Sequence, residues 1–200
     1  MAPDMTETSQ TSSTEGVLLA AGLSTRSGRY KMALPLGDKA VIQRSIENMY
    51  DAVERIWVVV GWQADQVRAL SAPYAKVECV VNENFRQGMF SSIKTGLARV
   101  SAPRVFFQPG DCAFISPNVY ARMLSIEGEI VIPTYGGRKG HPVLLRGPVL
   151  PEILALPDDA ILRDYIQDRG FTAVAVEDEG ILLDIDTPHD YKTLRARYTP

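Results

Sequence analysis

The sequence predicts an α/β fold, with a mostly parallel, doubly wound β-sheet flanked by helices. Short runs of β-branched residues alternate with amphipathic segments along most of the 200 residues. The run RIWVVVG at residues 55–61 is apolar on both sides, which is typical of a strand buried inside a parallel sheet. An apolar run at residues 17–21 also ends in a loop of glycines and hydroxyl residues, a transition typical of anion-binding sites.

In the first two thirds of the chain, strand patterns and helix patterns alternate regularly. We expect strands at residues 17–21, 55–61, 77–81, 104–107 and 129–133. We expect helices at residues 40–52, 63–70, 91–100 and from 117 to about 125. Ser116 is the expected N-cap of the last of these helices, because Pro117 suits the first helical position.

The pattern changes after Pro133. We expect a loop or hairpin tip at residues 135–140, a returning segment at 142–145, short helices at 151–156 and 160–167, strands at 171–176 and 181–184, and a closing helix at 187–198. The chain has no internal repeat and no evident linker. The prediction is therefore a single domain over residues 16–200, preceded by a disordered N-terminal tail over residues 1–15.

Composition restricts the class of protein. The net charge is −3 and basic residues are scattered, so we expect no nucleic-acid partner. No apolar run approaches the roughly 18 residues of a membrane span, so we expect no membrane partner. The N-terminal residues lack the apolar segment of a signal peptide. Cys79 and Cys112 match neither a zinc site nor a disulfide framework, which favours a reducing, cytoplasmic location.

The loop after the first strand contains three cations within six positions, Arg26, Arg29 and Lys31. Small residues let backbone N–H groups approach a phosphate, and cations neutralise its charge. The spacing matches neither a Walker A motif nor a dinucleotide fingerprint, because Lys31 is followed by Met32 and the glycines are Gly22 and Gly28. The pattern favours a phosphate-binding loop, and the alternative is an ordinary strand–helix turn.

Two acidic positions could bind one hard cation. Asp111 follows the apolar strand at residues 104–107, where ligands collect in open parallel sheets, and Asp186 lies in the segment LLDIDTP at residues 182–188. Carboxylates from distant parts of the chain can share one Mg²⁺, with phosphate oxygens and water completing the shell. The alternatives are a turn aspartate at position 111 and a helix-capping aspartate at position 186. Asp184 would share a face with Asp186 if the segment is extended.

Two further segments contain candidate binding residues. Asn82, Gly88, Ser91 and Ser92 lie between a strand end and a helix, where polar groups favour anions or a sugar–base edge. Their alternative role is a simple helix cap by either serine. His141, in a Gly-His-Pro turn, could contact a substrate or be structural.

These motifs together resemble the MobA-like NTP transferase family, and most closely its molybdenum cofactor cytidylyltransferase branch. The matching segments are LAAGLSTRSGRYK at residues 19–31, LPLG at 34–37, VN at 81–82, GMFSSIKTGL at 88–97, GD at 110–111, PTYGGRKGHPV at 133–143 and LDIDTPHDY at 183–191. The resemblance covers nearly all of the chain from about residue 16 onward, in family order. It implies a Rossmann-like nucleotidyltransferase fold with a mostly parallel sheet.

The resemblance also implies roles for individual residues. The catalytic residues would be Arg26, Lys31 and Asp111, and the Mg²⁺ ligands Asp111 and Asp186. Acceptor-binding residues would be Arg138, Gly140 and His141. The nucleotide-binding set would be Leu19, Ala20, Ala21, Gly22, Ser24, Arg26, Lys31, Asn82, Gly88, Ser92 and Gly110.

The function that the resemblance implies is Mg²⁺-dependent transfer of CMP from CTP to a molybdopterin-type molybdenum cofactor, with release of pyrophosphate. In this family Ala-Ala-Gly, here Ala20-Ala21-Gly22, goes with cytidine and Ala-Gly-Gly with guanosine. A molybdenum hydroxylase is a possible recipient of the product. Two alternatives remain: a nucleotidyltransferase for a sugar or polyol phosphate, suggested by the unusual Cys112-Ala113 after Gly-Asp, and a non-catalytic cofactor carrier.

Overall fold

The computed structural model of the chain describes residues 13–23 and 30–198. Most of the expected N-terminal tail, and the predicted site residues Ser24 and Arg26, lie outside these ranges. Strand β1 begins at Thr14, three residues before the expected strand at residues 17–21, and the domain boundary at residue 16 stays a prediction. Thr14 and Glu15 are buried, since they align with Arg104 and Arg55 on the two neighbouring strands.

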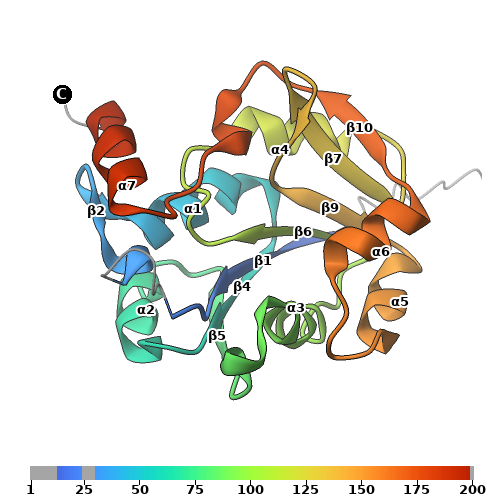
Figure 1. Cartoon of the computed structure of the whole chain (residues 1–200), viewed down its shortest axis with the longest axis horizontal. Helices are drawn as coiled ribbons and strands as arrows, with labels where there is room; N and C mark the ends of the chain where they lie inside the picture. The colour runs from blue at the N-terminus through green and yellow to red at the C-terminus, as the bar shows by residue number, and fades with distance from the viewer. Residues whose placement is uncertain (1–12, 24–29, 199–200) are drawn as a thin grey trace, which may run out of the picture.

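Eight strands form one sheet, in the order β10-β7-β9-β6-β1-β4-β5 with β8 paired to β7 (Figure 1). The four strands β6, β1, β4 and β5 are parallel, β10 is parallel to β7, and β9 is antiparallel to both β6 and β7. The sheet strands are β1 Thr14–Ala20, β4 Arg55–Val60, β5 Val77–Val81, β6 Arg104–Pro109, β7 Ile130–Tyr135, β8 Arg138–Lys139, β9 Val143–Arg146 and β10 Thr172–Ala175. A separate small hairpin joins β2 (Pro35–Leu36) and β3 (Lys39–Ala40).

Helices cover both faces of the sheet. The α-helices are α1 Val41–Met49, α2 Ala64–Ser71, α3 Met89–Leu97, α4 Pro117–Leu124, α5 Val149–Ala155, α6 Leu162–Arg169 and α7 Pro188–Arg195. Short 3-10 turns are η2 Lys31–Ala33, η3 Tyr50–Ala52, η4 Phe85–Gln87, η5 Glu179–Leu182 and η6 Ala196–Tyr198. Within the described parts of the chain, no helix combines the length and the apolar character needed to cross a membrane.

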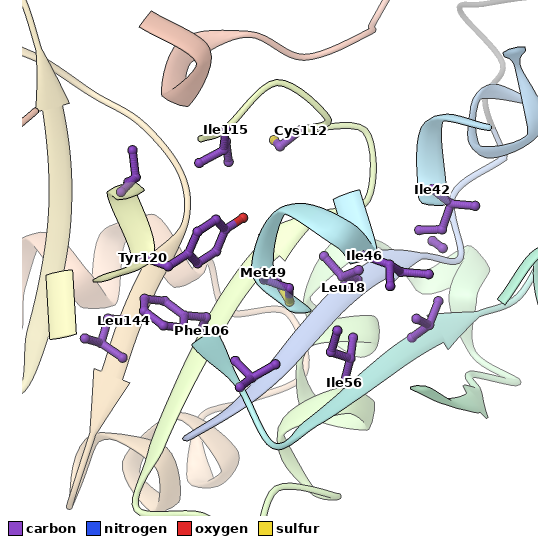
Figure 2. Close-up of a cluster of buried hydrophobic side chains, with 14 of the residues drawn as sticks. Leu18, Ile42, Ile46, Met49, Ile56, Phe106, Cys112, Ile115, Tyr120 and Leu144 are labelled. Carbon is purple, nitrogen blue, oxygen red and sulfur yellow. The ribbon is translucent and has the colours of Figure 1, made fainter. Parts of the chain in front are cut away.

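Strand β1 shows how the sheet divides the core into two layers. Its side chains alternate, so Leu18 packs with α1, α2 and α4, whereas Val17 and Leu19 pack with α3, α5 and α6. Figure 2 shows the first layer, in which Phe106 of β6 meets Tyr120 of α4 edge to face. A third, smaller cluster seats α7 against the β2 region, which lies beside it in Figure 1.

Most of the predicted elements are confirmed, with ends shifted by a few residues. Ser116 caps α4 as expected, since its hydroxyl accepts a hydrogen bond from the Asn118 amide at 3.3 Å. The predicted strand at residues 181–184 is wrong: the chain forms the 3-10 turn η5 there. The cause is Asp178, whose carboxylate accepts a hydrogen bond from the Gly180 amide at 2.8 Å and closes a turn. The β2–β3 hairpin was not expected from the sequence.

Candidate active site

The candidate site lies where β1 and β6 end. Both strands are parallel, so their carboxyl ends meet at one edge of the sheet, the usual ligand edge of open α/β folds. The Gly110 amide donates to the Leu19 carbonyl at 2.9 Å, which extends the pairing by one residue. A Cβ at Gly110 would lie 2.9 Å from the Met32 sulfur and 3.0 Å from Leu19 O, so a larger residue would crowd this turn. The chain then places Asp111 at the edge.

Lys31 joins the two predicted metal ligands. Its Nζ lies 2.6 Å from Asp111 Oδ2 and 3.0 Å from Asp186 Oδ1. The side chains of Lys31 and Asp111 are 14% and 8% exposed, whereas that of Asp186 is 34% exposed, so the cluster opens to solvent on the Asp186 side. Burial alone would lower the pKa of Lys31, but the two carboxylates outweigh burial and raise it.

Asp186 does not cap α7, which corrects one of the two alternatives for this residue. The N-cap is Thr187, whose hydroxyl accepts a hydrogen bond from the Asp190 amide at 3.1 Å. Asp190 in turn accepts from the Thr187 amide at 2.8 Å, completing a capping box. The pKa of the neighbouring Asp184 is raised, first by burial and then by the charges of Asp111 and Asp186. The carboxylates of Asp111, Asp184 and Asp186 therefore all interact electrostatically with Lys31.

The first strand ends in the predicted nucleotide loop. Leu19, Ala20 and Ala21 are buried, and Gly22 is exposed. A Cβ at Gly22 would meet no atom of the described residues within 4 Å, so this side of the backbone is not covered by them. The Tyr30 hydroxyl, which the sequence did not single out, donates to the Ala20 carbonyl at 2.8 Å and holds the far end of the loop against β1.

Asn82 organises the segment between β5 and α3. Its Nδ2 group donates to the hydroxyls of Ser91 and Ser92, both at 2.9 Å, and its Oδ1 accepts from the Asn84 amide at 2.9 Å. The alternative in which Ser91 or Ser92 caps α3 is wrong, because the N-cap is Gly88, with a φ of 116° that favours glycine. Asn82 and Ser92 are buried, and their contact with a nucleotide stays a prediction.

The predicted acceptor residues lie beyond β7. Arg138 is exposed on β8, at the tip of the hairpin with β7, and its role stays a prediction. The His141 amide donates to the Ile181 carbonyl at 2.9 Å. Its side-chain Nδ1 is buried with no hydrogen-bond partner among the described residues. Burial lowers the pKa of His141 to about 4, although the nearby charge of Asp111 acts to raise it. The imidazole is therefore neutral at pH 7.

Three polar side chains behind Asp111 were missed by sequence reasoning. Ser45 of α1 donates to the Gly110 carbonyl at 2.7 Å. Tyr120 donates to Gln108 Oε1 at 2.6 Å, and Gln108 Nε2 donates to the Cys112 carbonyl at 3.4 Å. A usable signal was present, because Ser45 and Gln108 interrupt apolar patterns of a helix and a strand. Fully buried polar groups in such places are usually hydrogen-bonded.

Cys112 belongs to the core and does not face the candidate site at the ends of β1 and β6. Its side chain lies among the buried residues of the first layer (Figure 2). Burial raises the pKa of its thiol well above the usual value, and the neighbouring Asp111 adds to this. A protonated, enclosed thiol is a poor nucleophile, so the unusual Cys112-Ala113 pair changes packing behind Asp111 and supplies no reactive group.

The chain was compared with known proteins. Residues 16–174 match the model of the MobA-like NTP transferase domain, so the chain belongs to this family of nucleotidyltransferases. It is 29% identical over 184 residues to the molybdenum cofactor cytidylyltransferase of Escherichia coli K12, covering 92% of this chain and 96% of that protein. The fold is therefore the Rossmann-like nucleotidyltransferase fold expected from the sequence.

Solved structures agree with this assignment. Rv0371c of Mycobacterium tuberculosis has a TM-score of 0.80 and 28% identity, over 92% of this chain and 98% of that one. A complex of Rv0371c with manganese has a TM-score of 0.76 and 27% identity, with the same coverage. A nucleotidyl transferase from Methanothermobacter (Mth528) has a TM-score of 0.82 at 23% identity, over 93% of this chain and 97% of that one, which shows the same fold.

The donor set at the site fits a divalent cation. Asp111 and Asp186 supply hard carboxylate oxygens, and both lie within hydrogen-bonding distance of one cationic atom. Residues 13–23 and 30–198 contain no group of three or more His, Cys, Asp or Glu side chains arranged to hold a metal. A cation bound here would therefore need further ligands from water and substrate phosphates, which is how Mg²⁺ is commonly held in phosphate-transfer sites.

Proposed function

We propose that this protein is a Mg²⁺-dependent nucleotidyltransferase that moves CMP from CTP to a molybdopterin-type molybdenum cofactor and releases pyrophosphate. The observation that supports it most is the convergence of Lys31, Asp111 and Asp186 at the carboxyl edge of β1 and β6. Similarity to the cytidylyltransferase of Escherichia coli along nearly the whole chain supports the choice of substrates.

This reaction requires the protein to align the two substrates and to neutralise the charge on their phosphates. A terminal phosphate of the acceptor attacks the α-phosphorus of CTP in line, and pyrophosphate leaves. Because the attacking phosphate is already ionised, no strong general base is needed, and the neutral His141 is suited to hydrogen bonding. Asp111 and Asp186 would hold Mg²⁺, which when bound neutralises charge on the phosphate oxygens. Lys31, together with Arg26, would offset the charge that grows on the departing pyrophosphate.

We assign the selection between nucleotides to residues at the end of β1. The backbone from Ala20 to Gly22 and the Ser92 side chain would contact the base, and the sequence Ala20-Ala21-Gly22 favours cytidine over guanosine by its resemblance to the family. Asn82 supports this arrangement, because its hydrogen bond at 2.9 Å fixes the Ser92 hydroxyl.

The direct test is a pyrophosphate-release assay with each nucleoside triphosphate, with and without Mg²⁺, in the presence of purified molybdopterin. We expect release with CTP that depends on both Mg²⁺ and molybdopterin. Release driven by a sugar phosphate or a polyol phosphate in place of molybdopterin would overturn the acceptor assignment. Stoichiometric binding of the cofactor without release would indicate a carrier instead of an enzyme.

Asp111→Asn tests the metal assignment. The amide keeps the shape of the carboxylate but removes its charge, so we expect the fold to remain and Mg²⁺-dependent turnover to fall by at least about 100-fold. Asp158→Asn is a matched control, since Asp158 also pairs with a lysine, Lys94, at 2.7 Å on a different part of the surface. The measurements are initial rates across Mg²⁺ concentrations and circular dichroism. Turnover near the wild-type rate in Asp111→Asn would remove Asp111 from the metal site.

A further inference from the structure

One carboxylate connects the two segments that position the predicted metal ligands. Asp178 Oδ2 accepts a hydrogen bond from the Ser116 amide at 2.7 Å, at the end of the loop that begins with Asp111. Asp178 Oδ1 accepts from the Gly180 amide at 2.8 Å, in the η5 turn that precedes Asp184 and Asp186. Asp178 and Ser116 are 62 positions apart in the sequence, so Asp178 adds a tertiary cross-link to its local role as the N-cap of η5.

The η5 turn makes two contacts that leave no room for a side chain, one at its own Gly180 and one at Gly140 of a neighbouring turn. A Cβ at Gly180 would overlap the carbonyl group of Phe114, which lies in the Asp111 loop. A Cβ at Gly140 would overlap the carbonyl group of Ile181, which also accepts the His141 amide at 2.9 Å. The turn therefore touches both the loop behind Asp111 and the turn that contains His141.

The two segments lie outside the sheet. Residues 112–116 and 183–187 belong to no strand, and they share one apolar cluster that contains Ala113 and Ile185. Lys31 Nζ lies within 3.0 Å of a carboxylate oxygen from each side. Two hydrogen bonds from backbone amides to one carboxylate add a polar restraint on the separation of the two segments.

We propose that Asp178 is a positioning residue for the metal site: by binding the Ser116 and Gly180 amides together, it keeps Asp111 and Asp186 at the separation that one cation requires. Asp178 acts through the backbone and touches neither substrate nor metal. The proposal rests on the proposed function, because it takes Asp111 and Asp186 as the metal ligands. Residues that orient metal ligands in this way typically change metal affinity by about 10-fold to 100-fold when they are replaced.

The test compares Asp178→Ala and Asp178→Asn in the full chain. Mn²⁺ binding in the presence of CTP is measured by the electron paramagnetic resonance signal of free Mn²⁺. We expect the dissociation constant to rise by about 10-fold or more in Asp178→Ala, and by less in Asp178→Asn, which keeps one oxygen acceptor. The Mg²⁺ concentration needed for half-maximal turnover should rise in parallel, and saturating Mg²⁺ should restore much of the rate.

Glu15→Gln is the matched control for loss of stability. Glu15 is a buried carboxylate that also bonds distant groups, accepting from the Ser101 hydroxyl at 2.8 Å and from Trp57 Nε1 at 2.6 Å. It lies near the amino end of β1, at the edge of the sheet away from the site. We expect Glu15→Gln to lower the melting temperature without changing Mn²⁺ affinity. Unchanged Mn²⁺ affinity in Asp178→Ala, or an equal loss in Glu15→Gln, would overturn the proposal.

Hydrogen exchange tests the role of Asp178 independently of the proposed function. In Asp178→Ala, amides in residues 112–116 and 179–186 should exchange faster, whereas amides of β1 and β4 should not change. If the wild-type protein binds no Mn²⁺ and releases no pyrophosphate, the proposed function fails. Faster exchange confined to these two segments would then still support Asp178 as their cross-link, and unchanged exchange there would refute it.

Discussion

The ammonium group of Lys31 lies between two carboxylates that are 80 and 155 positions away along the chain. Two carboxylates this close repel one another, and the lysine offsets that repulsion in the absence of another cation. The same amine is expected to face the triphosphate when a nucleotide is bound. Lys31 would therefore exchange one set of negative partners for another, and its flexible side chain permits such a movement.

Lys31→Ala should have opposite effects on metal binding and on turnover. Without nucleotide, removal of the competing ammonium should tighten Mn²⁺ binding, because Asp111 and Asp186 lose their internal cation. With CTP and acceptor, turnover should fall by at least about 100-fold, because charge on the phosphates is no longer offset. Calorimetry with Mn²⁺ and initial rates measure the two effects.

Lys76→Ala is the control for this prediction, since Lys76 also places its amine at 2.8 Å and 3.0 Å from two acceptors, the carbonyls of Tyr50 and Val53. It should change neither measurement. Weaker Mn²⁺ binding in Lys31→Ala would show that the amine does not compete with a metal. A change confined to acceptor binding would contradict the assignment of Lys31 to the phosphates.

At the scale of elements, α3 shows how one residue sets the distance between a helix and the sheet. Gly96 faces β1 and β4, where a Cβ would lie 2.5 Å from Val17 Cγ1 and 2.9 Å from Val59 Cγ2. Both valines are fully buried, so neither can move aside easily. This close approach keeps α3, which contains Ser91 and Ser92 near its start, against the sheet.

Gly96→Ala should destabilise the protein, although alanine favours helix by about 1 kcal/mol. The added methyl group has no room, and overpacking of this kind costs about 1–3 kcal/mol, so the net free energy of unfolding should fall. Urea unfolding followed by circular dichroism measures the change. Gly22→Ala is the control: within residues 13–23 and 30–198 a Cβ there meets nothing within 4 Å, so stability should remain within about 0.5 kcal/mol of wild type. A gain of stability in Gly96→Ala would show that α3 can move away from the sheet.

At the scale of the whole molecule, the strand order brings distant segments to one edge. Strand β6 lies beside β1, which places Asp111 within reach of Lys31 although 80 residues separate them along the chain. The antiparallel β9 then returns the chain between β6 and β7, so that His141, just before β9, lies within the electrostatic reach of Asp111. The sheet thus brings three separate parts of the chain, around Lys31, Asp111 and His141, to one edge.

His141, whose Nδ1 atom is buried, predicts a pH dependence of global stability. Its pKa is about 4 in the folded protein and 6.5 when unperturbed, so the unfolded chain binds more protons between these values. The stability contribution of the neutral imidazole is therefore complete above pH 6.5 and is lost as the pH falls toward 4. The slope from this one group approaches about 1.4 kcal/mol per pH unit at most.

Urea unfolding between pH 5 and pH 8 checks this dependence. His141→Gln should flatten it, because no imidazole remains to be protonated on unfolding. His189→Gln is the matched control, since His189 is exposed on α7, and it should behave like the wild type. An unchanged pH profile in His141→Gln would show that the imidazole does not govern acid stability.

Local sequence patterns predicted the elements well where they depend on local forces. The apolar run of β4 and the Ser116-Pro117 start of α4 were found from periodicity and capping preference, which act over a few residues. The segment at residues 181–184 was mispredicted as a strand. Its apolar residues fit a strand, but Asp178 and Gly180 close a turn through contacts with residues 114 and 116, which no local pattern reveals.

The sequence by itself determined the alternation of strands and helices and the two acidic positions, and the phosphate-binding role of the loop at residues 22–31 stays a prediction. These depend on side-chain chemistry and on spacing along the chain. Only the tertiary structure decided that Lys31, Asp111 and Asp186 meet, that Asp178 hydrogen-bonds to both Ser116 and Gly180, and that His141 is neutral with its Nδ1 atom buried. The physical reason is that hydrogen bonds and burial depend on distances in space, and the order of the strands, not the distance along the chain, sets those distances.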